Sequence, residues 1–181
     1  MKLFKTIFLT LSLLVFSSCF DNLDFNRLND YVIRPTITTS LTSFTLLPFQ
    51  LFNDQGIQEN TITYTSNFDF FRNEIVEDNV VKFDFYSEIQ NEFDRNVTIT
   101  ISFLDENGVS IYDLSPIEVT SKDLNFSYLE EVEVKSNPDF KEVNSLKILA
   151  EIQDIGVQMD PLSDDEFRFK SSVTIYVETK L

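Results

Sequence analysis

Residues 97–111 read VTITISFLDENGVSI, and their pattern indicates the fold class. Its first seven residues alternate between hydrophobic side chains (Val97, Ile99, Ile101, Phe103) and hydroxyl side chains (Thr98, Thr100, Ser102). Such alternation is typical of a β-strand with one buried and one solvated face. The pair Asn107-Gly108 favours a tight primed turn, because both residues tolerate positive φ. The stretch therefore predicts a β-hairpin that returns through Val109 and Ile111.

Similar patterns recur along the rest of the chain. They predict further strands at residues 36–45, 61–66, 80–86, 117–120, 129–134, 146–152 and 166–179. We expect the last two to pair antiparallel across a loop at 156–165. Asn137 as a cap and Pro138 at the first helical position predict one short helix over 138–145. A second helix candidate over 46–54 is disfavoured by Pro48.

Many short strands joined by turns predict an all-β protein. We interpret residues 31–181 as a single immunoglobulin-like antiparallel β-sandwich. The same alternation fits a small outer-membrane barrel. The many charged residues on the polar faces, and hydrophobic faces suited to a core, favour the sandwich.

The first nineteen residues, MKLFKTIFLTLSLLVFSSC, have the pattern of an export signal. Two lysines precede a hydrophobic stretch of roughly ten residues, which is about half the length needed to span a bilayer. Small Ser17 and Ser18 follow, and then Cys19, the chain's one cysteine. We interpret residues 1–18 as a signal peptide and residues 19–30 as a tether.

Residues Phe16, Ser17, Ser18 and Cys19 resemble the lipobox of bacterial lipoproteins, with Phe16 where Leu is commonest. The resemblance implies that Cys19 carries a diacylglyceryl group and becomes the new N-terminus. Several acyl chains at about 0.8 kcal/mol per CH₂ make such anchoring effectively permanent. In composition the chain is also similar to small Bacteroidota envelope lipoproteins. That likeness implies a cell-envelope location, expected at the outer membrane, with the periplasmic or surface face left open.

Charge and composition exclude several classes of function. The net charge is −16, and removing the signal with Lys2 and Lys5 would take it to −18. Such a surface repels phosphate backbones, so we expect no nucleic-acid partner. Histidine is absent, and only three glycines occur. A histidine base, a G-x-S-x-G elbow and a glycine-rich phosphate loop are therefore missing, and we expect neither an enzyme nor a cofactor.

Two groups of residues are candidate sites. Asp160, Asp164, Asp165 and Glu166 could supply oxygen ligands to calcium, but their spacing matches no EF-hand, and a solvated acidic loop is the favoured interpretation. The SNFDFF stretch could expose aromatic rings, although Phe68 and Phe70 at alternate spacing fit a core better.

Two functional hypotheses follow from these patterns. The first is a non-catalytic, membrane-anchored envelope lipoprotein that acts as an interaction or structural module with a protein partner. The second is a lipoprotein that captures a ligand, either a glycan or calcium. A glycan-array signal or a calcium-dependent shift in melting would favour the second hypothesis.

Overall fold

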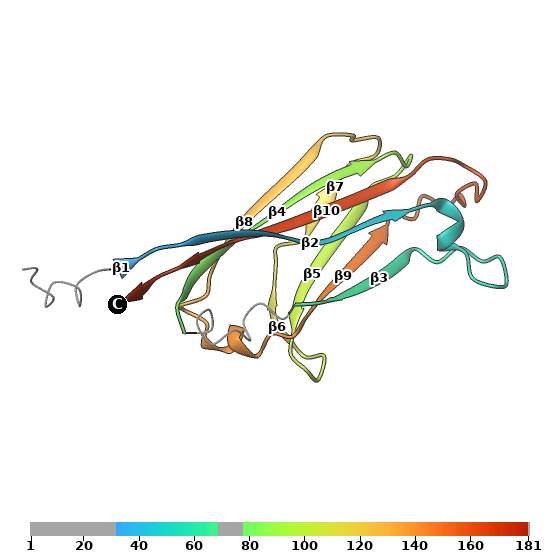
Figure 1. Cartoon of the computed structure of the whole chain (residues 1–181). Helices are drawn as coiled ribbons and strands as arrows, with labels where there is room; N and C mark the ends of the chain where they lie inside the picture. Colours follow the sequence, from blue (N-terminus) through green and yellow to red (C-terminus); the bar gives the residue numbers. More distant parts are fainter. Residues whose placement is uncertain (1–31, 69–77, 181) are drawn as a thin grey trace, which may run out of the picture. The chain divides into compact units, whose positions relative to one another are not determined.

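Antiparallel β-strands make up most of the computed structural model, which describes residues 32–68 and 78–180 (Figure 1). Residues Ile33–Thr179 form one compact unit. The long strands are β2 (Thr36–Leu46), β3 (Thr61–Asn67), β4 (Val80–Asn91), β5 (Val97–Leu104), β8 (Phe126–Glu133), β9 (Ser145–Ile152) and β10 (Phe167–Val177). The shorter strands are β1 (Val32–Ile33), β6 (Ser110–Asp113), β7 (Ile117–Val119) and β11 (Thr179–Lys180).

Two sheets face each other across a hydrophobic core. One sheet has the order β2-β10-β4-β8, and the other has the order β3-β9-β5-β6, with β7 also paired to β5. The antiparallel β-sandwich predicted from the sequence is confirmed. In each sheet a strand from the C-terminal part of the chain lies between two strands from the N-terminal part: β10 lies between β2 and β4, and β9 lies between β3 and β5. This is the strand order of a jelly roll rather than that of an immunoglobulin domain. Alternation shows which side of a strand is buried, but it does not specify the neighbouring strand.

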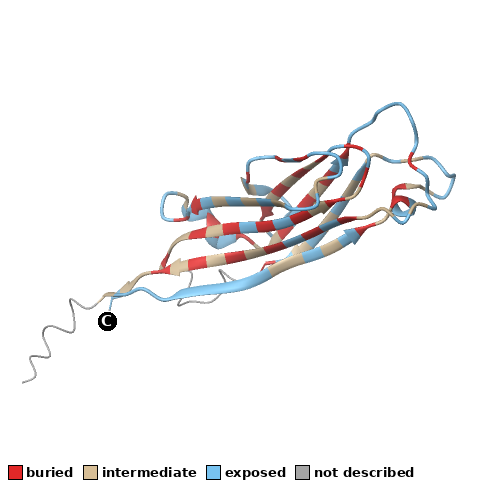
Figure 2. Cartoon of the chain, turned by 90° about the horizontal axis from the view of Figure 1, so that it is seen from above, coloured by how far each residue is buried: buried red, intermediate tan, exposed pale blue. Residues whose placement is uncertain are grey.

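Burial alternates along most of the long strands, and Figure 2 shows this as bands of red and paler colours. Strand β2 is the exception, because its residues 36–40 are all exposed. The inner faces carry large aromatic side chains, including Phe83, Phe103 and Phe167, all 0% exposed. Each fully buried side chain of this size contributes roughly 1.5–3 kcal/mol to folding. The Phe103 ring centroid lies 5.4 Å from Phe83 and 6.0 Å from Phe140, so the core continues beneath the loops.

The predicted helix over 138–145 is a shorter 3-10 helix, η4 (Pro138–Glu142). The Asn137 side chain accepts a hydrogen bond from the Asp139 backbone N–H, as an N-cap should. The disfavoured second candidate contains one 3-10 turn, η2 (Pro48–Leu51), with Pro48 in its first turn. No helix in the described residues is long and apolar enough to cross a membrane.

The predicted pairing of residues 146–152 with the C-terminal strand is wrong. Strand β9 pairs with β3 and β5, whereas β10 pairs with β2 and β4 in the opposite sheet. The connection over residues 153–166 therefore passes from one sheet to the other and does not close a hairpin. It is long enough to make this crossing, and strand periodicity does not distinguish the two routes.

The hairpin of β5 and β6 is confirmed, but its turn differs from the predicted primed type. Only Gly108 in the turn has positive φ, at +78°. The Asp105 carboxylate accepts hydrogen bonds from the backbone N–H groups of Asn107 (2.9 Å) and Val109 (2.7 Å). These bonds hold Asn107 in an ordinary conformation, and the register shifts at Phe103 and Leu104 as in a turn followed by a bulge.

Candidate functional site

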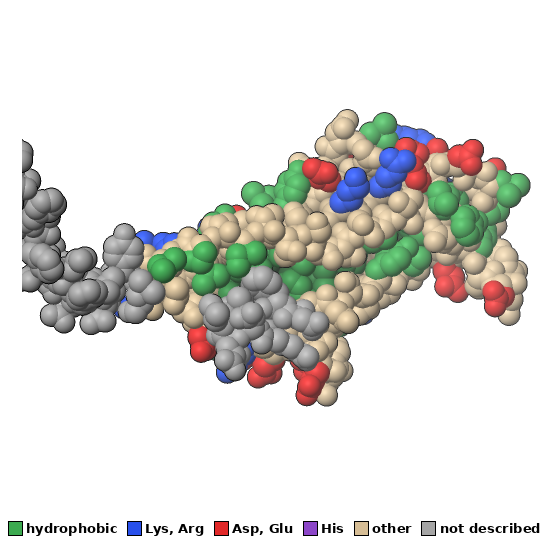
Figure 3. Space-filling view, in the orientation of Figure 1, with side chains coloured by type: hydrophobic (Ala, Val, Ile, Leu, Met, Phe, Trp, Pro, Cys, Tyr) green, Lys and Arg blue, Asp and Glu red, His purple; other side chains and the backbone are tan. Residues whose placement is uncertain are grey.

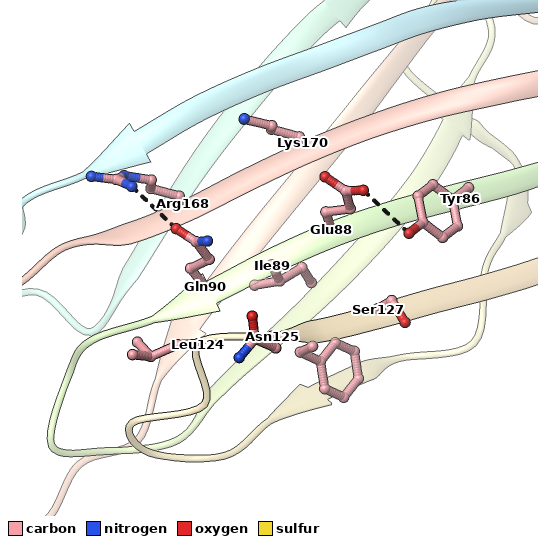
Figure 4. A pocket seen from close by; sticks show the side chains of 10 residues that line it. Tyr86, Glu88, Ile89, Gln90, Leu124, Asn125, Ser127, Arg168 and Lys170 are labelled. Carbon is pink, nitrogen blue, oxygen red and sulfur yellow. Dashed lines mark hydrogen bonds between the residues drawn. The ribbon is translucent and has the colours of Figure 1, made fainter.

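A groove of about 390 Å³ lies on the outer face of the β2-β10-β4-β8 sheet (Figure 4). Its floor and walls come from β4, β8, β10 and the connection that precedes β8. The lining residues are Tyr86, Glu88, Ile89, Gln90, Leu124, Asn125, Phe126, Ser127, Arg168 and Lys170. This volume falls in the range of roughly 300–1,000 Å³ that small-molecule sites occupy.

Strand register brings these distant residues together. Gln90 on β4 lies opposite Arg168 on β10, and Glu88 lies opposite Lys170. On its other side Glu88 faces Ser127 of β8. These side chains all point outward, because their neighbours along each strand face the core. Ser127 is small, so the sheet surface is hollow at this position while longer side chains rise around it.

Hydrogen bonds hold several of the groove's polar groups in place. Arg168 donates to the Gln90 side-chain oxygen at 3.1 Å and forms an ion pair with Glu166. The Tyr86 hydroxyl donates to Glu88 Oε1 at 3.3 Å. Desolvation and the adjacent Glu88 carboxylate raise the pKa of Tyr86, so this hydroxyl remains a donor at neutral pH. These bonds hold the side chains of Tyr86, Glu88, Gln90 and Arg168 in defined positions.

Lys170 differs from the other charged residues of the groove. Its cross-strand neighbour is Glu88, yet Lys170 makes no hydrogen bond or ion pair within the described part of the chain, and Figure 4 shows the ammonium directed away from Glu88. The side chains of Asn125 and Ser127 likewise carry no hydrogen bond there. The ammonium group of Lys170 is therefore open to a ligand, although Glu88 lies opposite it on β4.

The wall of the groove depends on a buried amide beneath it. Asn91 is 0% exposed, and its side-chain nitrogen donates to the carbonyl oxygens of Arg95 (3.0 Å) and Thr120 (2.9 Å). Its backbone N–H donates to the Asp123 carbonyl oxygen at 2.7 Å. These bonds fix the segment that carries Leu124 and Asn125 into the groove.

A second exposed surface lies at the end of the sandwich where β2 ends and β10 begins. We call it the loop end, and it consists of residues 47–60 and 153–166. Five hydrophobic side chains are exposed there: Phe49 (57%), Ile57 (52%), Ile155 (45%), Val157 (67%) and Leu162 (88%). Figure 3 shows hydrophobic side chains and carboxylates together on this end of the molecule.

The two segments of the loop end are joined to each other and to the sandwich. The Met159 backbone N–H donates to the Gln58 side-chain oxygen at 2.7 Å. The Arg95 guanidinium, only 2% exposed, donates to the Val157 carbonyl oxygen at 3.1 Å and pairs with Asp94 at 2.8 Å. That pairing lowers the pKa of Asp94. The exposed hydrophobic side chains are thus held on a fixed backbone.

Comparison with known proteins shows no matching protein-family profile and no matching curated sequence. A protein of Parabacteroides distasonis that was inferred to be secreted superposes with a TM-score of 0.48 at 17% identity, over 63% of this chain and 37% of that one. The VP2 subviral particle of infectious bursal disease virus gives 0.38 at 14% identity, over 84% and 34%. Desmodium yellow mottle tymovirus gives 0.39 at 9% identity, over 83% and 89%. The chain thus spans little more than a third of the first two proteins.

The four carboxylates considered as calcium ligands have different partners in the structure. Asp160 accepts a hydrogen bond from the Leu162 backbone N–H at 2.9 Å, and Asp165 pairs with Lys122 at 3.1 Å. Glu166 pairs with Arg168, and Asp164 is exposed. Residues 32–68 and 78–180 contain no group of three or more His, Cys, Asp or Glu side chains placed to hold a metal.

Of the other residues singled out in the sequence, the structure describes Phe68 but not Phe70, Phe71 or Cys19. Phe68 is 4% exposed and belongs to the core, where its ring centroid lies 5.5 Å from that of Phe103. Phe70, Phe71 and Cys19 lie outside the described residues, as do the predicted signal peptide and tether. The groove was not predicted from the sequence. The polar alternation of Tyr86, Glu88 and Gln90 was its one available signal.

Proposed function

We propose that this chain is a lipid-anchored, non-catalytic interaction module of the bacterial cell envelope that presents its loop end to a protein partner. The segment from Phe16 to Cys19 supports the anchor, because the chain's only cysteine directly follows two small residues and a hydrophobic stretch. The lack of histidine supports a binding role over acid–base catalysis.

The observation that carries the partner proposal is the exposed hydrophobic surface of the loop end. Isolated exposed hydrophobic residues are ordinary, but a group of them on one surface marks an interaction site. Here Leu162 is 88% exposed and Val157 is 67% exposed, on a segment fixed by the hydrogen bonds of Arg95 and Gln58. A fixed surface loses little conformational entropy on binding.

The charges around this surface indicate the chemistry of the partner. Residues 47–60 contain two carboxylates and residues 153–166 contain five, and neither segment contains Lys or Arg. Among the described residues of the chain, Asp165 and Glu166 are the ones of these carboxylates that form ion pairs. The complementary surface is a basic protein face with a hydrophobic centre, because opposite charges at the rim steer association and disfavour wrong partners.

The path of β2 supports a loop end that is directed away from a membrane anchor. The chain enters the sandwich at Thr36, and β2 runs eleven residues to Leu46 beside the loop end. At about 3.3 Å per residue, the strand covers roughly 36 Å. The first residue of β2 and the loop end therefore lie at opposite ends of this strand.

Anchoring is tested with the variant Cys19→Ser in the native host. The wild-type protein should fractionate with membranes, and mass spectrometry should find an acylated N-terminal Cys19. The variant should leave the membrane fraction or retain its leader. A wild-type protein that keeps Met1, or that is cut elsewhere and found freely soluble, would refute the anchor.

Docking is tested by placing a photo-crosslinking amino acid at Leu162 in one strain and at Val109 in another. Val109 is 59% exposed and belongs to the turn between β5 and β6, so it is a matched control outside the loop end. We expect one discrete adduct from position 162 and none from position 109. Val157→Glu should abolish the adduct, and added salt should reduce it. An adduct that forms equally from position 109, or that survives Val157→Glu, would contradict docking at the loop end.

A further inference from the structure

The groove on the outer face of the sheet is separate from the loop-end surface and needs an occupant of its own. We propose that the groove formed by β4, β8 and β10 binds a neutral oligosaccharide. This site goes beyond the protein-docking role proposed above.

The groove contains both a carboxylate and basic side chains, and this combination disfavours ligands that carry a net charge. Glu88 presents a carboxylate between Tyr86 and the opposite Lys170, while Arg168 lies one pair further along the strands. A polyanion would meet Glu88 and the net charge of −16 on the whole chain. A cation would meet Lys170 and Arg168. A neutral ligand avoids both penalties.

Sugar hydroxyls match this set of groups, because each hydroxyl both donates and accepts hydrogen bonds. Lys170 offers donors, and the side chains of Asn125 and Ser127 offer both functions. None of these three side chains is bonded within the described part of the chain, so a ligand would break no existing ion pair or hydrogen bond to reach them. The Gln90 amide and Glu88 add acceptors that already have fixed positions.

The groove also has a surface for the apolar face of a sugar ring. Tyr86 is 38% exposed, and its bond to Glu88 fixes the ring at the edge of the groove. Leu124, 47% exposed, adds a second hydrophobic wall. The C–H groups of a pyranose carry partial positive charge, and they pack on the negative face of an aromatic ring.

The length of the groove fits more than one sugar. Tyr86 and Gln90 are four residues apart on β4, which corresponds to about 13 Å at roughly 3.3 Å per residue. Polar groups are spread along this length, from the Tyr86 hydroxyl through Glu88 to the pair of Gln90 and Arg168. A short linear oligosaccharide can contact them together, whereas a single sugar ring reaches only part of the set.

The experiment titrates residues 32–181 with oligosaccharides while backbone amide shifts are recorded by NMR. This segment contains the whole compact unit Ile33–Thr179. A parallel titration uses residues 19–181 with the substitution Cys19→Ser, and it checks that removing residues 19–31 does not change binding. The neutral probes are maltotriose, cellotriose and mannotriose, and the acidic probe is trigalacturonate. We expect at least one neutral probe to bind at millimolar concentration or below, with shifts at β4, β8 and β10.

Three variants decide whether binding occurs in the groove. Tyr86→Ala should weaken binding about tenfold through loss of the stacking surface. Lys170→Gln should weaken it about three- to tenfold through loss of a charged donor. Lys147→Gln is the matched control, because Lys147 is exposed on β9 in the opposite sheet, and it should change nothing.

Three results would overturn the proposal. One is the absence of binding by every neutral probe at millimolar concentration. Another is binding that Tyr86→Ala and Lys170→Gln leave unchanged although both variants melt as the wild type does, since the ligand would then bind elsewhere. The third is tighter binding of trigalacturonate than of any neutral probe, which would make the site an anion site. None of these results bears on crosslinking from position 162, so the two proposals fail independently.

Discussion

Replacement of Asn91 by alanine should be among the most damaging polar substitutions in this protein. The side chain is completely buried, and it accepts a hydrogen bond from the Phe93 backbone N–H at 3.1 Å. Its amide nitrogen donates to the carbonyl oxygens of Arg95 and Thr120 at 3.0 and 2.9 Å. One residue of β4 thus holds the connection that leads to β5 and the connection that leads to β8.

The magnitude follows from what alanine would leave behind. The buried Phe93 N–H would lose its partner, at a cost of about 1–3 kcal/mol, and two amide hydrogen bonds worth about 1 kcal/mol each would be lost. We expect the free energy of unfolding to fall by about 4 kcal/mol, a large part of the total stability of a domain. For roughly 150 residues this corresponds to a decrease in Tm of about 8–16 °C.

The measurement is urea and thermal unfolding followed by far-ultraviolet circular dichroism. Asn107→Ala is the matched control, because Asn107 is exposed and its side chain donates a long hydrogen bond, of 3.4 Å, to Asp105. That variant should change stability by less than about 0.5 kcal/mol. If Asn91→Ala also cost less than about 1 kcal/mol, the buried amide would not hold these connections, and the reasoning would be wrong.

Asn91→Asp tests the same amide through pH. The variant keeps the side-chain shape but points a carboxyl group at two carbonyl oxygens, so burial should raise its pKa above the ordinary value of about 3.9. A raised pKa in the folded state gives stability that is present below the unfolded pKa and is lost as pH rises through the folded pKa. The stability difference from wild type should therefore grow from about pH 4 toward pH 7, and a difference independent of pH would count against the geometry.

Three further predictions concern the core, a tyrosine and a turn. Phe103→Ala should lower the free energy of unfolding by about 3–5 kcal/mol in urea titrations, because Phe103 is 0% exposed at the centre of the aromatic core. Burial and the Glu130 acceptor raise the pKa of Tyr128 to about 12, so its contribution to stability should be complete below pH 10 and lost as pH rises toward 12. Glu130→Gln should bring that pKa back toward 10 in a spectrophotometric titration. Gly108→Ala should cost about 1–2 kcal/mol through its φ of +78° alone, since nothing lies within 4 Å of the added methyl.

The sequence predicted most of the long strands well because those strands have one buried face. Phe167, Phe169, Val173, Ile175 and Val177 all face the core, as their shared spacing required. A one-residue shift would have placed this entire set in solvent, so the pattern constrains the structure strongly. The same pattern continued past the predicted end of the strand at residue 86, where Ile89 is buried in β4 as well.

The order of the strands could not be predicted by the same means. Residues 146–152 and the C-terminal strand are neighbours in sequence and both alternate, so a hairpin was the simplest expectation. The structure places them in different sheets, with β10 between β2 and β4. Which strand lies beside which depends on how whole faces pack together, and no single stretch of sequence encodes that. The turn between β5 and β6 could not be predicted from its Asn-Gly pair either. The Asp105 carboxylate oxygen determines the geometry of this turn by accepting hydrogen bonds from backbone N–H groups.

The groove follows from that strand order and not from any motif. Tyr86, Ser127 and Arg168 are separated by about 40 residues at each step of the sequence, and they meet only because β10 is inserted beside β4 while β8 pairs on the other side. The same β4 segment carries Gln90 outward into the groove and Asn91 inward to the connection that bears Leu124. A recognition surface and the buried amide that supports it are therefore consecutive residues of one strand. In this fold, any change that displaces β4 at this point must disturb stability and groove shape together, which is why the buried residue is as informative about binding as the exposed ones.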